Sequence, residues 1–473
     1  MGSLKIFFWL FFLLMGAVLG LWFRTHPTTS STSAEPQEVA SAPRWSGGAQ
    51  PLPRAAKLPT SVMPADFPEP VLGGASPPKA ALASALLAPG FYFDRVIVSP
   101  VVVDVWPDQV VVADVTGDGR NDIVLAIDAL LKVVLRIHAQ NADGTLADAI
   151  DLMSPIMATS GGGGSVEAVD LNNDGLPEIV VGAGQGLTVF RKTSGGYAYQ
   201  SYVGNVRSLS LGAIDLDGDG HRDIFAQGWE EGADIYLSDR HGGFRGAQRI
   251  ATPLSGYNTL EISDFTADGI ADVVMTNGQG WPKVVVYPAA FFGGLQSLIE
   301  IPMPAVQTMP SFGMTVADMD RDGRPDLVMP DEGNASASLR GIHVYYRGEG
   351  NSIRRHEFLH FQGMYQRPGA VQVADIDGNG YPDIVAMMNS YNQMAYILQG
   401  PSGFGEPVFQ TTSDNAWTNS HYMDNSFVIA DVNSDRCPDI VLAESSSSLR
   451  VFYGRNCQLP VRQTGGPLPA RRG

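Results

Sequence analysis

The segment GAIDLDGDGHRDIFA, residues 212–226, places a short apolar run before a loop of four aspartates and a second apolar run after it. The same pattern recurs six more times along the chain. These further segments begin at Val111, Glu167, Glu261, Thr315, Gln372 and Val428. The leading aspartates follow one another about every 50 residues, at Asp114, Asp170, Asp215, Asp264, Asp318, Asp375 and Asp431. Seven matches of this length indicate an internal repeat.

Each repeat has the pattern of four short strands. An apolar strand ends in Asp, a loop of the form D-x-[DNT]-x-[DN]-G-x-x-[DE] follows, and a β-branched strand comes next. An alternating strand and, in several repeats, a turn of Gly and an aromatic residue complete the unit. Four strands in about 50 residues, repeated, are typical of β-propeller blades. A β-sandwich does not repeat seven times, and a solenoid uses shorter coils. We therefore predict an all-β, seven-bladed β-propeller.

The two ends of the repeat region predict how the ring closes. Residues 93–102 have the pattern of a strand before the first repeat, whereas the Pro-rich residues after Cys457 make a poor fourth strand for the last one. The N-terminal strand is therefore expected to complete the seventh blade, which removes open sheet edges. Residues 445–448 form the turn midway between Cys437 and Cys457. An antiparallel hairpin places these two cysteines nearly opposite each other, so we predict a disulfide between them.

The composition narrows the possible functions. The chain has 473 residues, 49 Asp and Glu against 31 Lys and Arg, a formal charge of −18 and only 2 Cys. The negative charge argues against nucleic acid as a partner, because such proteins need a basic surface over the phosphates. Two cysteines provide neither a disulfide framework for this length nor a four-cysteine zinc site. The hydrophobic content of 44% excludes a disordered acidic chain.

The N-terminus predicts export. Residues 6–23, IFFWLFFLLMGAVLGLWF, form an uncharged apolar run that is followed by a Pro-, Ala- and Ser-rich segment. The run is near the lower length limit of a spanning helix, so a membrane anchor and a cleaved signal peptide both remain open. The protein is expected to be membrane-anchored facing the periplasm or exterior, or secreted. We predict residues 1–24 as signal or anchor, 25–91 as linker, 92–459 as propeller and 460–473 as a disordered tail.

The repeated loop has the chemistry of a calcium site. Ca²⁺ prefers six to eight oxygen ligands, and a tight loop can supply them from positions 1, 3, 5 and 9. The Gly at position 6 permits the sharp turn, and the closing acid at position 9 precedes a strand, unlike the helix of an EF-hand. The predicted ligands are Asp114, Thr116, Asp118, Asp122; Asp170, Asn172, Asp174, Glu178; Asp215, Asp217, Asp219, Asp223; Asp264, Thr266, Asp268, Asp272; Asp318, Asp320, Asp322, Asp326; Asp375, Asp377, Asn379, Asp383; and Asp431, Asn433, Asp435, Asp439.

Two considerations bear on this prediction. Asx turns favour the same residue types, but they do not explain four coordinating oxygens recurring in register. The seventh loop has Arg436 in place of Gly, which weakens its site. The loops contain 23 of the 49 carboxylates, and seven Ca²⁺ ions would change the formal charge from −18 to −4. We expect about one Ca²⁺ per blade, up to seven, in a structural role.

The loops and the Gly-aromatic turns resemble the FG-GAP/VCBS repeats of the integrin α-subunit N-terminal propeller and of many bacterial exported proteins. The resemblance covers about residues 92–456. It implies a propeller whose first-to-second-strand loops bind Ca²⁺ on the lower face. Related propellers serve as adhesion modules, lectins, or scaffolds of polysaccharide lyases, so the resemblance does not choose among these activities.

The connectors on the opposite face suggest a recognition surface. They contain aromatic and polar residues that suit stacking and hydrogen bonding to a sugar or a peptide, although such aromatic residues also pack between blades. The candidate ligand-binding residues are Trp106, Arg207, Tyr257, Trp229, Trp281, Tyr365, Trp417 and His421. No catalytic motif occurs, so no catalytic residue is predicted. We expect a monomeric recognition or adhesion module for a glycan or protein. The alternative is a polysaccharide lyase or hydrolase on the same scaffold.

Overall fold

The computed structural model of the protein describes residues 91–100, 106–129, 132–157, 164–183, 186–204, 210–227, 232–254, 258–277, 283–290, 293–303, 313–333, 340–361, 367–388, 393–412, 426–444 and 448–457. All of them belong to one compact unit, Pro77–Gly473. The apolar N-terminal run, the linker and the C-terminal tail lie outside these ranges. Within the ranges, no helix has the length and apolar character that a membrane crossing requires.

The described strands form seven four-stranded antiparallel sheets. Blade 1 contains β2 (Trp106–Ala113), β3 (Asp122–Ala129), β4 (Lys132–His138) and β5 (Ile150–Met157). Blade 2 contains β6 (Ser165–Val169), β7 (Glu178–Ala183), β8 (Gly186–Thr193) and β9 (Gly196–Gly204). Blade 3 contains β10 (Ser210–Ile214), β11 (Asp223–Gln227), β12 (Ala233–Ser238) and β13 (Phe244–Ile250). Blade 4 contains β14 (Asn258–Ser263), β15 (Asp272–Asn277), β16 (Val284–Tyr287) and β17 (Ile299–Ile301).

The remaining three blades follow the same order. Blade 5 contains β18 (Thr315–Ala317), β19 (Asp326–Glu332), β20 (Arg340–Arg347) and β21 (Ile353–His360), with a short 3-10 turn, η2 (Glu349–Asn351), between the last two strands. Blade 6 contains β22 (Pro368–Ala374), β23 (Asp383–Met388), β24 (Gln393–Ile397) and β27 (Val408–Thr411), with a small hairpin of β25 (Gln399–Gly400) and β26 (Gly403–Phe404). Blade 7 contains β28 (Phe427–Ala430), β29 (Asp439–Glu444), β30 (Ser448–Arg455) and β1 (Tyr92–Pro100).

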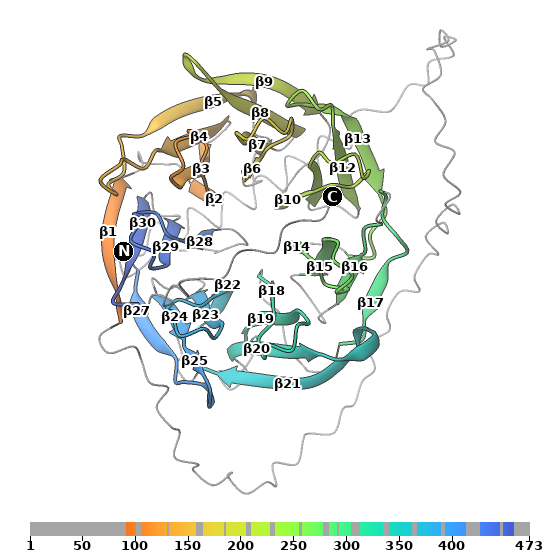
Figure 1. Ribbon diagram of the computed structural model, residues 1–473, viewed down its shortest axis with the longest axis vertical. Helices are drawn as coiled ribbons and strands as arrows, with labels where there is room; N and C mark the ends of the chain where they lie inside the picture. Colours follow the sequence, from red (N-terminus) through yellow and green to blue (C-terminus); the bar gives the residue numbers. More distant parts are fainter. Residues whose placement is uncertain are drawn as a thin grey trace, which may run out of the picture. The chain divides into compact units, whose positions relative to one another are not determined.

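The seven sheets lie around a ring, with β2, β6, β10, β14, β18, β22 and β28 innermost (Figure 1). The apolar core is correspondingly divided into seven clusters, and each cluster joins two consecutive blades. One of them packs Ile123 of blade 1 against Val441 and Val451 of blade 7, which closes the circle. The predicted seven-bladed β-propeller is therefore confirmed.

The N-terminal strand completes the last blade, as the sequence predicts. Strand β1 pairs antiparallel with β30, from Tyr92 opposite Arg455 to Pro100 opposite Ser448. Figure 1 shows this pairing at the ring's left edge, where the first and last described strands lie side by side. A disulfide joins Cys437 to Cys457 in the same blade. The strand pairing thus joins the two ends of the repeat region, and the disulfide links the start of β29 to the end of β30 within blade 7.

The burial of each strand depends on its place in the blade. The second strands are buried on both faces, as in β11 and β23, because a neighbouring blade covers each face. This explains their continuous apolar runs, which replace the alternation of a half-buried strand. The outermost strands carry more exposed residues, as in β13. The loops between first and second strands all emerge where these buried strands begin, and this arrangement brings similar loops together on one face.

Candidate metal centres

The seven predicted calcium loops each connect the first and second strands of a blade, and we number loop and blade alike. Positions 1 to 9 of a loop run from the leading Asp to the closing acid. The closing acids begin the second strands and are buried: Asp122, Glu178, Asp223, Asp272, Asp326, Asp383 and Asp439. In loop 3, Asp223 accepts the backbone N–H groups of Leu216 and Ser238, both at 2.7 Å. The closing carboxylate thus ties its loop to the end of the third strand.

The other closing acids repeat this arrangement with one variation. Each of five closing acids accepts one N–H from its own loop and one from a residue within two positions of the end of the third strand. They are Asp122, Asp272, Asp326, Asp383 and Asp439. Glu178 instead accepts the N–H of Leu171 and the side-chain amide of Asn172. The longer glutamate side chain therefore reaches position 3 of its own loop.

The leading aspartates organise the turn itself. Asp215 accepts the backbone N–H groups of Gly218, Asp219 and Gly220 at 2.7 to 3.2 Å. Asp219 in turn accepts the N–H of His221 at 2.8 Å, which is an Asx turn. The hydrogen bonds that the Asx-turn alternative requires are therefore present, together with the carboxylates that a metal site requires.

Carboxylates converge in three of the loops. In loops 3, 5 and 6, oxygens from positions 1, 3 and 9 lie within 4.8 Å of one another, and these clusters could hold a metal ion. They consist of Asp215, Asp217 and Asp223; Asp318, Asp320 and Asp326; and Asp375, Asp377 and Asp383. Oδ1 of Asp320 and Oδ1 of Asp375 are inaccessible to solvent and have no hydrogen-bond partner among the described residues. Buried carboxylate oxygens need a partner, and a hard cation supplies one.

Burial disfavours the charged form of the closing acids in loops 3, 5, 6 and 7. Burial raises the pKa of Asp223 and of Asp326 to about 6, because the charged form loses its hydration, and the neighbouring aspartates raise it further. Burial raises the pKa of Asp383 to about 8 and that of Asp439 to about 7 in the same way. Backbone N–H groups oppose these shifts only in part. A divalent ion would favour the charged carboxylates at each cluster.

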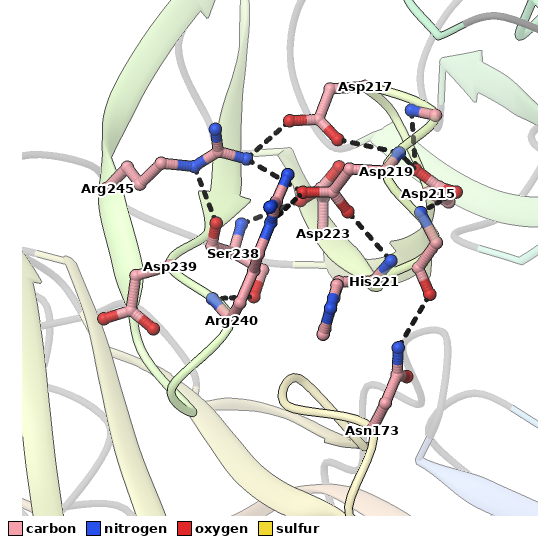
Figure 2. Close-up of polar contacts among 12 residues, drawn as sticks. Asn173, Asp215, Asp217, Asp219, His221, Asp223, Ser238, Asp239, Arg240 and Arg245 are labelled. Carbon is pink, nitrogen blue, oxygen red and sulfur yellow. Dashed lines mark hydrogen bonds and ion pairs between the residues drawn. The ribbon is translucent and has the colours of Figure 1, made fainter.

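Arginines that the sequence reasoning missed surround loop 3 (Figure 2). Arg245, on β13, contacts Asp217 at 2.5 Å and Asp219 at 3.4 Å. Arg240 contacts Asp219 at 2.8 Å. Arg354 occupies the same place in blade 5 and contacts Asp320 and Asp322. The sequence does not reveal this equivalence, because Arg245 follows its closing acid by 22 residues and Arg354 by 28.

Neighbouring loops are also tied to one another. The carbonyl oxygen of Leu171 in loop 2 accepts a hydrogen bond from Ser238 Oγ of blade 3 at 2.8 Å. Asn173 of loop 2 donates to the carbonyl of Gly220 in loop 3 at 2.9 Å (Figure 2). Blade 6 repeats the first tie, since the Gln399 amide donates to the carbonyl of Met319 in loop 5. Ordering one loop therefore supports the next around the ring.

The seventh loop differs at position 6. The six other loops have Gly there, with φ between 82° and 87°, and Arg436 takes a similar left-handed conformation with φ of 72°. Its N–H still donates to Asp431 at 2.8 Å, so the turn keeps its hydrogen bond. A non-glycine residue is strained in this region. The loop thus retains the shape of the others at a local cost.

The predicted recognition surface falls almost entirely outside the described residues. This applies to Arg207, Tyr257, Trp229, Trp281, Tyr365, Trp417 and His421. Trp106 is the first residue of β2, whereas the sequence reasoning placed it in the connector before that strand. The extra residues pair with β3, since Trp106 lies opposite Asp128.

Family models match the repeats directly. The model of the FG-GAP-like repeat matches residues 114–181, 215–275 and 264–329, and that of the FG-GAP repeat matches residues 162–203. The chain carries FG-GAP repeats. The FG-GAP matches cover loops 1 to 5, and the same strand and loop geometry continues through blades 6 and 7. No curated protein matches the sequence.

Solved structures of low sequence identity are similar to this FG-GAP propeller. An Agrocybe aegerita lectin, described as recognising non-reducing terminal N-acetylglucosamine, is 18% identical over 65% of this chain and 81% of its own, with a TM-score of 0.45. BBS1N, solved in complex with ARL6DN, is 11% identical over 79% of this chain and 98% of its own, with a TM-score of 0.49. A Bacillus licheniformis rhamnogalacturonan lyase is 16% identical over 76% and 75%, with a TM-score of 0.34.

Proposed function

We propose that this FG-GAP propeller is an exported calcium-binding protein that uses its ring as a recognition or adhesion module. The carboxylate clusters of loops 3, 5 and 6, with their oxygens within 4.8 Å, carry the calcium part of the proposal. All donors in these clusters are hard oxygens, which suit Ca²⁺ and not a soft transition metal. Loops 1, 2, 4 and 7 carry a neutral Thr or Asn at position 3 and complete the set of up to seven sites.

The ion's role in this proposal is structural. A bound Ca²⁺ would supply the charge that offsets the clustered carboxylates. The chain's own residues hold the loop conformation. The closing acids anchor the second strands, the leading aspartates shape the turns, and the hydrogen bonds between loops connect the blades. Calcium removal is therefore expected to lower the melting temperature of the chain measurably. An unchanged melt after EDTA treatment would contradict the calcium part.

The recognition part rests on the sequence. Aromatic and amide residues recur in the connectors of the face opposite the loops, with Trp229 and Trp281 in polar, Gly-containing segments. Flat aromatic rings stack on sugar rings and on peptide side chains, which suits a glycan or protein ligand. The apolar N-terminal run supports export of the protein out of the cytoplasm, to surroundings in which calcium is abundant. Residues 25–91 would then serve as the tether.

A glycan array tests the recognition part. The full chain, kept in detergent, would be applied to the array with Ca²⁺ and again after chelation. We expect binding to a restricted set of glycans that is lost or weakened without Ca²⁺. Turnover of a polysaccharide without stable binding would overturn the recognition proposal and favour the lyase or hydrolase alternative.

A further inference from the structure

Arg245 has a specific relation to the carboxylates of loop 3. Its Nε donates to the carbonyl oxygen of Ser238 at 2.6 Å, which fixes the guanidinium over the loop. Its Nη2 then reaches Oδ2 of Asp217 and Oδ2 of Asp219, the side chains at positions 3 and 5 (Figure 2). The arginine thus contacts the outer oxygens of the loop.

Arg354 repeats this geometry in blade 5. Its Nε donates to the carbonyl oxygen of Arg347 at 2.9 Å, and its Nη2 contacts Oδ2 of both Asp320 and Asp322. The other oxygen of Asp320, Oδ1, is the buried one that has no partner within the described residues. Holding Oδ2 on the arginine therefore leaves Oδ1 available inside the cluster.

A comparison with the other blades relates these arginines to the number of aspartates in each loop. In blades 1 to 6 the fourth strand follows the third in the chain. The pairing of these two strands defines, in each of these blades, the position equivalent to Arg245 and Arg354. It is occupied by Ala147, Ala198, Arg245, Gln296, Arg354 and Gly405. The two arginines occur in the two blades whose loops have Asp at both positions 3 and 5. In the other four blades one of those positions is Thr or Asn, and the equivalent residue is uncharged.

We propose that Arg245 and Arg354 are positioning residues that match the charge of the four-carboxylate loops, and that they oppose calcium binding there. The inference rests on the proposed calcium function. A guanidinium beside the carboxylates offsets their mutual repulsion before an ion binds, and it repels the ion afterwards, since like charges interact over such distances. Each arginine therefore stabilises the calcium-free loop more than the loaded loop. Gln296 of blade 4 makes the same backbone contact, to Ala289 at 3.0 Å, without the charge.

The test replaces both arginines by glutamine, R245Q with R354Q, in the full chain in detergent. The control is R249Q with R355Q, which removes two charges from the same strands, where Arg249 pairs with Asp234 and Arg355 with Glu357, away from the loops. Equilibrium dialysis with radioactive Ca²⁺ measures the free calcium at which two ions are bound per chain. We expect this concentration to fall about tenfold in R245Q/R354Q relative to the control, and less at high salt.

A second measurement keeps the test independent of calcium affinity. In EDTA, R245Q/R354Q should melt at a lower temperature than the control. Lysine at both positions should restore part of the difference, because it keeps the charge but not the hydrogen bonds of the guanidinium. Wild-type chain that binds no calcium would overturn the proposed function and this inference with it. Calcium binding by the wild type that is unchanged or weaker in R245Q/R354Q would overturn the inference alone.

Discussion

The residues at positions 4 and 6 of every loop adopt a left-handed backbone conformation, which restricts the residue types that suit these positions. Position 4 is variable, since Asn173, Ala267 and Arg321 take it with φ of 60° to 63°. Position 6 is glycine in all loops but the seventh. At Arg436 the side chain is exposed and the backbone has the same turn, so the residue incurs strain without burying surface.

Arg436→Gly should therefore stabilise the protein. We expect about 1 kcal/mol of added free energy of unfolding, because glycine adopts the left-handed conformation without steric cost. Urea denaturation with a constant slope would measure it as a higher midpoint. Gly380→Arg, at the same position of loop 6, is the reciprocal control and should destabilise by a similar amount. Destabilisation by Arg436→Gly would contradict the strain argument.

In several blades the inner strand has a polar residue three positions before the leading Asp. In blade 6 this residue is Gln372, whose amide donates to the carbonyl of Phe427 at 2.7 Å and whose oxygen accepts from Ile429 N–H at 3.2 Å. In blades 2 and 4 the position is Glu167 and Glu261. An ionised glutamate has no hydrogen to donate, so it cannot reproduce both bonds.

The glutamates should make stability depend on pH. Burial raises the pKa of Glu167 and of Glu261 to about 7, and the charge of Glu167 raises that of Glu261 further. Because these folded-state values lie above the usual value of 4.5, stability is lost as the pH rises from about 4.5 to about 7. Glu167→Gln with Glu261→Gln should raise the melting temperature at pH 8 and leave it unchanged at pH 4. Exposed Glu406→Gln is the control, and an equal effect there would contradict the assignment.

Blade 5 contains a second pH-dependent group with the opposite sign. Buried Asp331 contacts Nε2 of His343 at 3.1 Å, and Nδ1 of His343 lies 2.7 Å from Nε2 of His356. Only one proton fits between those two ring nitrogens. When His343 carries a single ring proton, on Nε2 toward Asp331, its Nδ1 accepts and His356 is the donor. Burial, and then the neighbouring His343, lower the pKa of His356.

Because the pKa of His356 is lowered in the folded state, its contribution to stability is present above the unfolded-state pKa near 6.5 and is lost as the pH falls. We expect His356→Phe, which can keep the ring stacking on Tyr345, to reduce the loss of melting temperature between pH 7 and pH 5. Exposed His360→Phe, on the same strand, should leave that slope unchanged. An equal slope in wild type and His356→Phe would contradict this assignment.

At the scale of the whole molecule, the repeat made the architecture predictable. Seven equivalent loops give the number of blades, and the strand left over at residues 93–102 indicates the closure. The arginines over loops 3 and 5 could not be derived in the same way. The connections between the second and third strands differ in length, from Gln227 to Ala233 in blade 3 and from Glu332 to Arg340 in blade 5. Only the pairing of Ser238 with Phe244 and of Arg347 with Ile353 makes Arg245 and Arg354 equivalent.

Ring closure also makes a residue near the start of the propeller contribute to a blade far along the chain. Phe93 of β1 packs in one core cluster with residues of blades 6 and 7, and its ring lies 5.5 Å from that of Tyr396 in blade 6. Phe93→Ala should therefore reduce the free energy of unfolding by about 3 to 5 kcal/mol, through lost burial and a cavity. Tyr92→Ala, at the adjacent position that is 51% exposed, is the matched control and should cost far less. Equal denaturation midpoints for the two variants would mean that β1 adds little to closure, so that the packing of β29 and β30 against blade 1 holds the ring by itself.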